Sequence, residues 1–552
     1  MEPLDEHDTI ARSDALNLLV IAPPGCGKTE LLARRTAVVV ERLGRNQKVL
    51  ALTFSNKAKQ NLRQRISDLL GGAAARRFVT VQNFHGLAAS IVRAHGRTLG
   101  LDPSFAMPGK RTLAAAIKPF TAGLRYDVAM ARQNAIEIAL RRAKQAPRTD
   151  AEVVKHLELL GNEFALIIEH NRQQEGTLHY DDILRHSHRL LSIPAVANLY
   201  QHHFGGSIVD EFQDLSGQQL DLAMLASSGY RTFAGDPLQG IYSWAGADPA
   251  GVEARLRQVC GEPRKLHSSF RSSPAVLKTV NTVATSLGGD SLHAHHPDRW
   301  QDGGASSALT FSSGTDEANW IVATTGQILS ASPLATIGVI ARSAWRRKQV
   351  DSAFARSDTP HTQWDLALDD AGVVKAIRDA AKLLPKDSSI EALRAKILDN
   401  LPLDDFEAYN DLLDALEHLE ALAEGSNSAW EAVRRLKVRD PNRAVTPGVH
   451  LLNAHTGKGQ QFDWVFIPGF EGFHIPSGQA KTPKEHEEES RALLVMLSRA
   501  RHGIILTRAA TLVSKNGKVY SPDVSRFWGI VAHSCTLTKA QLEEHIHRSK
   551  SF

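Results

Sequence analysis

The stretch Ala22-Pro23-Pro24-Gly25-Cys26-Gly27-Lys28-Thr29 decides the fold, because it has the spacing of a phosphate-binding loop. An apolar run at Leu16–Ile21 precedes it and predicts a buried strand, whereas Thr29–Leu43 has the pattern of a helix. The glycines let backbone N–H groups approach phosphate, and a helix N-terminus adds positive potential. We therefore predict a nucleotide site in which Lys28 reaches the β- and γ-phosphates and the Thr29 hydroxyl holds Mg²⁺.

A second motif follows some way along the chain, where the apolar run Ser207–Val209 ends in Asp210-Glu211-Phe212-Gln213-Asp214. A carboxylate at the end of a strand can hold the Mg²⁺ shell, and its neighbour can polarise the attacking water. An acidic surface turn is the alternative for such a cluster on its own. After a phosphate loop, the motif predicts Asp210 as a metal ligand and Glu211 as the residue that activates water.

Composition sets broad limits on the class of protein. The chain has 552 residues, 23% charged and 42% hydrophobic, which is ordinary for a globular protein and long enough for about three or four domains. The net charge of +5 permits a nucleic-acid partner without demonstrating one. Cys26, Cys260 and Cys535 lack metal spacing and are too few for a disulfide framework, so we expect a reducing, cytoplasmic setting. No apolar run approaches about 18 residues, so we expect no membrane span.

Strand and helix patterns alternate along most of the chain, which predicts an α/β fold with parallel sheets covered by helices. Two stretches interrupt the alternation. Residues 86–175 have a helical pattern rich in Arg and Ala, and residues 385–446 have an acidic helical pattern. Within the first stretch, Arg141-Arg142-Ala143-Lys144 could add a basic face, but we expect the run to lie on a solvated helix surface. The predicted strands are Leu16–Ile21, Val49–Phe54, Phe78–Val81, Ser207–Val209, Thr232–Ala234, Ala308–Phe311, Thr336–Ile340, Val449–Ala454, Trp464–Ile467 and Ile504–Thr507.

Further motifs occur in a fixed order along the chain. They are Leu52-Thr53-Phe54-Ser55-Asn56-Lys57-Ala58, Phe84-His85, the stretch from Gly235-Asp236 through Gln239 to Trp244, Phe270-Arg271-Ser272, His455-Thr456-Gly457-Lys458-Gly459 and Leu497-Ser498-Arg499-Ala500. In type and order they resemble the UvrD/Rep/PcrA branch of superfamily 1 DNA helicases. The resemblance implies two tandem RecA-like P-loop domains, each with a mainly helical insertion, and ATP in the cleft between them. We expect the first domain at 1–85 and 176–265, its insertion at 86–175, the second domain at 266–384 and 447–552, and a small insertion at 385–446.

The same resemblance implies roles for individual residues. Arg271 and Arg499 match the two arginine fingers of the family, and Gln239 matches its γ-phosphate sensor. A solvated helix arginine is the alternative for Arg499. With Lys28, Asp210 and Glu211 these residues make the expected catalytic set. The expected nucleotide ligands are Ala22, Pro23, Pro24, Gly25, Cys26, Gly27, Lys28, Thr29, Gln239, Arg271, Gly459 and Arg499, with Thr29 and Asp210 also on the metal.

Aromatic residues near strand ends indicate a nucleic-acid partner, because bases of any sequence stack on aromatic rings. Burial in the core is the alternative for Phe54 and Trp244. Candidate contacts to the phosphate backbone are Lys57, His85 and His455. For the two histidines, a packed structural role is the alternative. The predicted DNA-binding residues are Phe54, Lys57, His85, Tyr242, Trp244 and His455.

The sequence also departs from the family it resembles. The stretch Leu4-Asp5-Glu6-His7-Asp8 lacks the glutamine that reads adenine, Ala245 stands where an arginine is usual, and Gln461 replaces a glutamate. The leading interpretation is a Mg²⁺- and ATP-dependent translocase that moves 3′ to 5′ on single-stranded or tailed DNA. The alternative is a DNA-sensing ATPase subunit that regulates a partner nuclease, similar to the helicase-like subunit of the Gabija anti-phage system. The small insertion at 385–446 favours this alternative.

Overall fold

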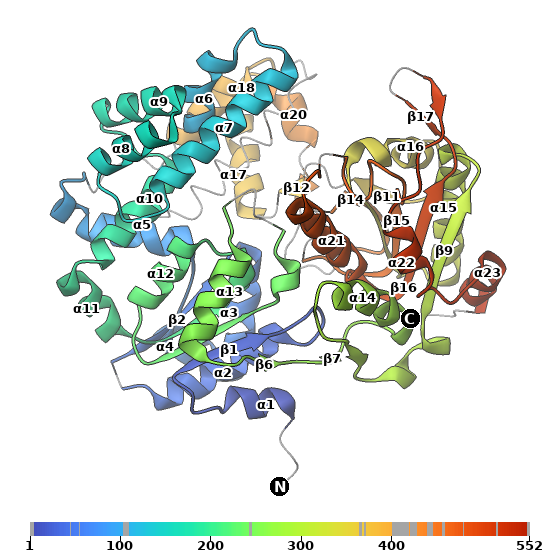
Figure 1. Ribbon diagram of the computed structural model, residues 1–552, viewed down its shortest axis with the longest axis horizontal. Coiled ribbons are helices and arrows are strands. Elements are labelled where there is room, and N and C mark those ends of the chain that lie inside the picture. Colours follow the sequence, from blue (N-terminus) through green and yellow to red (C-terminus); the bar gives the residue numbers. More distant parts are fainter. Residues whose placement is uncertain are drawn as a thin grey trace.

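The computed structural model describes residues 5–44, 46–54, 56–102, 110–241, 246–363, 367–368, 371–399, 419, 428–435, 437–438, 445–454, 459–478, 480–514 and 517–548. Within these ranges the structure does not describe a few side chains, among them that of Lys57. Two six-stranded parallel sheets form the two halves of the molecule, and a helical bundle stands above the first half (Figure 1).

The first sheet has the strand order β3-β2-β4-β5-β1-β6, so the strands that carry the phosphate loop and the carboxylates lie near its centre. All of its pairs are parallel, which brings the carboxyl ends of the strands to one edge. Its strands are β1 (Asn17–Ile21), β2 (Lys48–Thr53), β3 (Val79–Asn83), β4 (Phe204–Asp210), β5 (Tyr230–Gly235) and β6 (Arg264–Lys265).

Helices cover both faces of this sheet, because β1, β2, β4 and β5 present apolar side chains on both sides. One face packs against α1 (Glu6–Ala11), α2 (Lys28–Arg42), α3 (Asn56–Leu70) and α4 (Gly72–Phe78). The other face packs against α5 (Phe84–His95), α10 (Tyr180–Leu191), α11 (Pro194–His203), α12 (Gly217–Leu225) and α13 (Pro249–Cys260).

Four helices between α5 and α10 form a bundle with its own core, which includes Ile136, Leu140 and Leu157. They are α6 (Lys110–Thr121), α7 (Tyr126–Lys144), α8 (Asp150–Leu160) and α9 (Glu163–Gln174). Lys144, expected on a solvated surface, is buried instead, so that expectation was wrong. Its ammonium lies 2.8 Å from the carboxylates of both Glu169 and Asp182, which joins the bundle to α10. The charge was visible in the sequence, but its partners come from distant helices.

The second sheet has the order β11-β14-β10-β15-β16-β9 and is also parallel throughout. Its strands are β9 (Ala305–Phe311), β10 (Thr336–Ala341), β11 (His361–Gln363), β14 (Gly448–Asn453), β15 (Phe462–Pro468) and β16 (Ala500–Ala509). One face packs against α14 (Pro274–Ser286), α21 (Pro483–Leu497) and α22 (Trp528–Ala532), and the other against α15 (Gly314–Ala331), α16 (Ala344–Ala355) and α23 (Lys539–Arg548).

The α/β class with parallel sheets and two tandem RecA-like halves, predicted from the sequence, is confirmed. Between the two halves run the short strands β7 (Ser268–Ser269) and β8 (His293–Ala294). Much of the predicted 385–446 insertion lies outside the described residues. Its described part includes α18 (Ile390–Asp399) and α20 (Ala429–Arg435), and α17 (Ala371–Lys382) precedes it. The domain boundaries given above stay predictions.

Candidate functional site

The phosphate loop lies between β1 and α2 and has a backbone that requires glycine. Gly25 and Gly27 have φ angles of 85° and 74°, in the left-handed region. A Cβ on Gly25 would lie 2.7 Å from the Cβ of Arg271, and one on Gly27 would lie 2.7 Å from Nε2 of His7. The loop is thus closely surrounded, and its N–H groups stand at the start of a fifteen-residue helix.

Hydrogen bonds to the rest of the protein hold the start and the middle of the loop. The buried Ala22 donates its N–H to the Gly235 carbonyl of β5 at 2.8 Å. The Cys26 side chain is fully buried, and its carbonyl lies 2.8 Å from Nε2 of His7. On the far side, the Phe270 N–H donates to the Gly25 carbonyl at 2.9 Å. The buried residues Ala22 and Cys26 therefore fix the conformation of the loop, and the segment that carries Arg271 contacts the loop directly.

The two sequence motifs meet at Lys28. Its Nζ lies 2.8 Å from Oδ1 of Asp210 and 2.5 Å from Oε2 of Glu211. Burial alone would lower the pKa of the Lys28 ammonium, but the two carboxylates raise it above its usual range. Lys28 is therefore cationic and stands between the residues expected to hold the metal and the water.

A glutamine that the sequence analysis did not single out connects these carboxylates to the next motif. Gln213 is fully buried; its Nε2 donates to Glu211 at 2.6 Å and its Oε1 accepts from the N–H of Asp236 at 3.0 Å. Asp236 in turn accepts from Nε2 of Gln239 at 3.0 Å. Burial raises the pKa of the Asp236 carboxyl to about 6. The buried glutamine thus fixes Glu211 relative to the predicted sensor, Gln239.

Arg271 reaches the site from the segment that follows β7. Its Nη1 donates to the Ser498 carbonyl at 3.3 Å, and the adjacent Ser272 hydroxyl donates to the Ala500 carbonyl at 2.7 Å. Burial, together with the positive charges of Arg499 and Arg501, lowers the pKa of Arg271 to about 9. The guanidinium remains charged at neutral pH, and two like charges beside it favour the arrival of an anion.

Arg499 follows α21 and is only 4% exposed, so the solvated-surface alternative for it is wrong. It donates from Nε to the Val495 carbonyl at 2.9 Å and from Nη2 to Oε1 of Gln239 at 3.4 Å. The second contact crosses from the second half of the molecule to the first. Nη1 of Arg499 also donates to the Gln460 carbonyl at 3.4 Å, and the preceding Gly459 has a φ of 83°.

The donor set suits Mg²⁺ bound with a nucleotide. Mg²⁺ prefers oxygen ligands and is usually held by one or two carboxylates together with substrate phosphates and water. Asp210 offers a buried carboxylate at the end of β4, and Thr29 offers a hydroxyl in the first turn of α2. No group of three or more His, Cys, Asp or Glu side chains in the described part of the chain has the arrangement of a metal site of its own. A metal that arrives with phosphates fits these residues.

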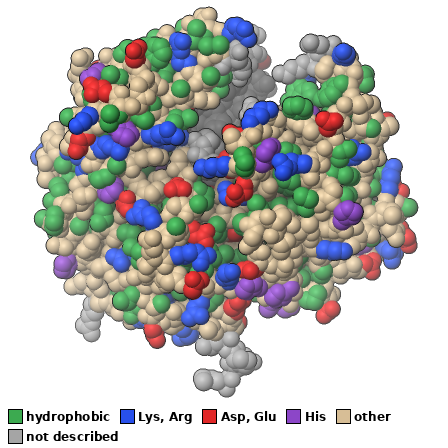
Figure 2. Space-filling model, viewed as in Figure 1, with side chains coloured by type: hydrophobic (Ala, Val, Ile, Leu, Met, Phe, Trp, Pro, Cys, Tyr) green, Lys and Arg blue, Asp and Glu red, His purple; other side chains and the backbone are tan. Residues whose placement is uncertain are grey.

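The predicted DNA-binding residues that can be described lie where the first sheet ends. Phe54 follows β2 and is 37% exposed, which favours the surface role over the core alternative. His85 lies in the first turn of α5, and its ring stacks on that of Tyr180 with centroids 4.0 Å apart. Tyr242, Trp244 and His455 lie outside the described residues, as does the side chain of Lys57. Lys and Arg side chains border the hollow between the two halves (Figure 2).

Sequence reasoning missed Gln213 and His7. Gln213 stood inside the Asp210–Asp214 motif, and its position between two carboxylates was a usable signal. His7 was noted only because the stretch lacks a glutamine, and nothing in the sequence indicates that its ring would meet the Cys26 carbonyl.

A phosphate loop on a parallel sheet, with paired carboxylates beside it and arginines from the half of the molecule that holds a second such sheet, defines a P-loop nucleotide-binding protein with two RecA-like domains. Two family models match the chain: the UvrD/REP helicase N-terminal domain over residues 5–258 and the UvrD-like helicase C-terminal domain over residues 407–511. The chain belongs to the UvrD/Rep-like family of superfamily 1 helicases.

Individual relatives agree with this family. The ATP-dependent DNA helicase PcrA of Leuconostoc citreum is 26% identical over 62% of this chain and 47% of its own length. PcrA of Staphylococcus aureus is 25% identical over 51% of this chain and 40% of its own length, so the chain spans less than half the length of these relatives. A probable DNA helicase II homolog of Rickettsia felis is 22% identical over 89% of this chain and 90% of its own length. Across the described residues, the helices are all too short or too polar to cross a membrane.

Proposed function

We propose that this protein is an ATP-dependent motor that moves 3′ to 5′ on single-stranded DNA and hydrolyses ATP with Mg²⁺. One observation carries the proposal: the Lys28 ammonium lies between the carboxylates of Asp210 and Glu211, at 2.8 and 2.5 Å. A γ-phosphate with its metal would compete for the same three groups. Binding of Mg-nucleotide would therefore replace the ion pairs that Lys28 forms with Asp210 and Glu211.

The proposed catalytic roles follow from this arrangement. Lys28 binds the β- and γ-phosphates, and Asp210 with Thr29 holds the metal, which supplies charge neutralisation on the phosphates. Glu211 orients the attacking water, and the Gln213 amide keeps its carboxylate in place at 2.6 Å. Arg271 and Arg499 stabilise the charge that develops on the γ-phosphate, which requires the two halves to approach each other.

DNA is the polymer along which we propose that the protein moves. Phe54 and His85 lie at the carboxyl edge of the first sheet. The other predicted contacts, Lys57, Tyr242, Trp244 and His455, belong to motifs that the family resemblance assigns to DNA. Direction and strand preference rest on that resemblance. The alternative of a DNA-sensing ATPase that controls a nuclease gains no support from chain length, because a relative named as a probable helicase matches over nine-tenths of its own length.

The direct test is ATP hydrolysis by the purified chain with and without single-stranded DNA. DNA should raise the rate, and Lys28→Ala should reduce it to background while the thermal melting curve stays cooperative. Lys48, on β2 of the same sheet, is a matched control, and Lys48→Ala should leave stimulation intact. If Lys28→Ala keeps the wild-type rate, the proposal is wrong.

A further inference from the structure

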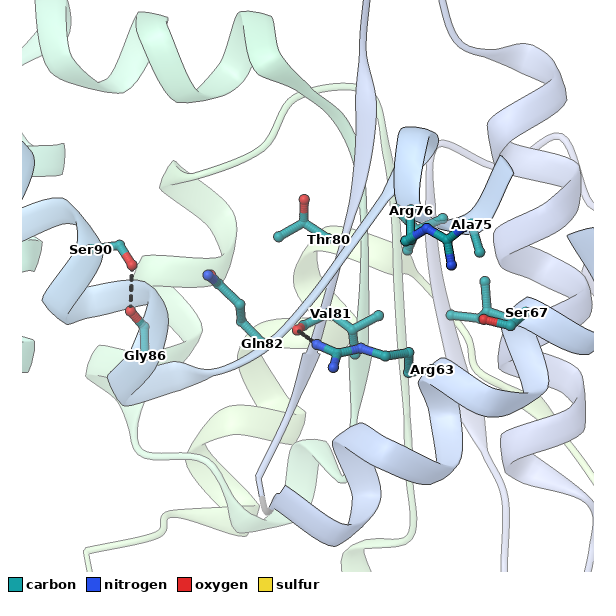
Figure 3. Close-up of a pocket in the computed structure, with 11 residues that line it drawn as sticks. Arg63, Ser67, Ala75, Arg76, Thr80, Val81, Gln82, Gly86 and Ser90 are labelled. Carbon is teal, nitrogen blue, oxygen red and sulfur yellow. Dashed lines mark hydrogen bonds between the residues drawn. The ribbon is translucent and has the colours of Figure 1, made fainter. Parts of the chain in front are cut away.

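A groove runs along the open edge of the first sheet, away from the nucleotide loop. It measures about 590 Å³ and lies at β3, the outermost strand. Helices α3 and α4 form one wall and the start of α5 forms the other (Figure 3). The lining residues are Arg63, Ile66, Ser67, Ala75, Arg76, Val79, Thr80, Val81, Gln82, Gly86 and Ser90.

The polar side chains of the groove are rich in donors. Two guanidinium groups, three hydroxyls and one amide line it, and no carboxylate does. Arg63 is held in place because its Nη2 donates to the Val81 carbonyl at 3.1 Å, as Figure 3 shows. An arginine fixed by one N–H presents its remaining donors in a planar fork that suits phosphate oxygens. This chemistry selects an anion.

The charge of the surrounding segment points the same way. Residues 56–78, which comprise α3 and α4, contain six basic residues and one acidic residue, a net charge of +5 that equals that of the whole chain. The single carboxylate, Asp68, accepts a hydrogen bond from Gln64 and does not line the groove. The segment is strongly basic, and the guanidinium groups of Arg63 and Arg76 bring positive charge to the groove itself, which favours a phosphate-rich partner.

The groove adjoins the residues proposed to contact DNA, because Gln82 and Gly86, which line it, flank the segment that carries His85. The register of β2 and β3 pairs Thr53 with Asn83, so Phe54 and His85 follow the sheet at the same edge. Gln82, a lining residue, comes one position before that edge. A strand that stacks on Phe54 can thus continue past His85 into the groove without leaving the first half of the molecule.

We propose that this groove binds phosphodiester groups of the DNA strand and lengthens the binding path beyond the carboxyl edge of the first sheet. The inference rests on the proposed function, because it takes DNA as the partner. Arg63 and Arg76 supply the charge, and Ser67, Thr80 and Gln82 supply further donors. Such contacts position the strand without reading its sequence.

The test measures binding of labelled oligo-dT to the full chain by fluorescence anisotropy over a range of about 50 to 200 mM salt. Each phosphate contact that is lost should reduce the slope of log K against log salt by about 0.7. We expect this change for Arg63→Ala and for Arg76→Ala, and about twice the change for the double variant. Because Arg63 also supports the Val81 carbonyl, Arg76→Glu at the exposed Arg76 provides a second variant that preserves this support.

Arg77→Ala is the matched control, since Arg77 adjoins Arg76 but lies over the Phe78 ring, 5.0 Å from its centroid, and not in the groove. ATP hydrolysis without DNA should be unchanged in all variants. A wild-type slope in the Arg63 and Arg76 variants would overturn the inference. The inference would also be overturned if the Arg63 and Arg76 variants lost the thermal stabilisation that inorganic phosphate gives the wild type while their slope with DNA stayed unchanged. The groove would then be a site for free phosphate. If the wild type itself does not bind DNA, the proposed function fails instead.

Discussion

Arg499 donates to the side-chain oxygen of Gln239 at 3.4 Å, and this contact joins the two halves of the molecule at the proposed nucleotide site. Gln239 donates through its own amide to Asp236 at 3.0 Å, and Asp236 is bonded through its N–H to Gln213, the residue that fixes Glu211. A change at the γ-phosphate can therefore reach the second half through a chain of hydrogen bonds. This chain is the physical basis of the coupling that we propose.

The first prediction concerns Arg499. Replacing it with lysine keeps one positive charge but removes the planar fork that binds transition-state oxygens and the contact to Gln239. DNA-stimulated kcat should fall by about 10³-fold or more, as for other arginine fingers, with a smaller change in nucleotide affinity. Steady-state ATPase kinetics measure both quantities. The control is Arg501→Lys, two residues along at a half-exposed side chain, and equal rates for the two variants would rule out the assigned role.

The second prediction concerns Glu211. Glu211→Gln retains the size of the side chain and removes the charge that orients water, while Asp210 and Thr29 still hold the metal. The variant should bind ATP and DNA tightly and hydrolyse ATP at least about 10²-fold more slowly. Rapid-quench single-turnover measurements separate binding from hydrolysis. Normal hydrolysis would place water activation elsewhere, and Asp214 would be examined next.

The third prediction concerns the buried carboxyl of Asp236. Its pKa is about 6 in the folded protein, above the ordinary value of 3.8, because burial disfavours the charged form. Between about pH 4 and 6 the folded state holds a proton that the unfolded state has released, so the free energy of unfolding falls as pH rises through this window. Above about pH 6 the burial of the charged carboxylate lowers the free energy of unfolding by a constant amount, at most about 3 kcal/mol.

Asp236→Asn removes this ionisation. The free energy of unfolding of the variant, relative to wild type, should increase from pH 4 to 6 and then stay constant. Urea unfolding at several pH values measures the difference, and the change with pH is informative even if the amide alters the bond to Gln239. If plots of the free energy of unfolding against pH ran parallel for the two proteins, they would contradict the raised pKa.

The fourth prediction concerns duplex unwinding by the isolated chain. Residues 385–446 contain thirteen acidic and eight basic residues, a poor composition for holding a polyanionic duplex, which depends on Lys and Arg. Unwinding of a 3′-tailed duplex should therefore be weak although movement on single strands is robust. A single-turnover assay with a trap strand measures it. Efficient displacement over tens of base pairs would contradict the prediction and remove the main support for a subunit that acts through a partner.

The elements of the first half could be predicted because local patterns determine them. The phosphate-loop spacing, the apolar runs at β1 and β4 and the helical pattern of α2 all agree with the structure to within a few residues. Short parallel strands that are buried on both faces give continuous apolar runs, which are easy to recognise.

The contacts between distant segments could not be predicted in this way. The sequence predicts Lys144 on a solvated basic helix surface. It is instead buried against Glu169 and Asp182, because the fold brings α7, α9 and α10 together. Gln213 likewise gained its role only when β4 and β5 became neighbours. Both cases depend on partners whose positions the local sequence does not encode.

The most direct test of the central claim is directional movement on single-stranded DNA. Streptavidin bound to biotin at either end of an oligonucleotide is released when a motor runs into it, so release rates report direction. We predict ATP-dependent release from the 5′ end, little release from the 3′ end, and none by Lys28→Ala. Robust DNA-stimulated hydrolysis without release from either end would show that ATP turnover is not coupled to movement and would contradict the account.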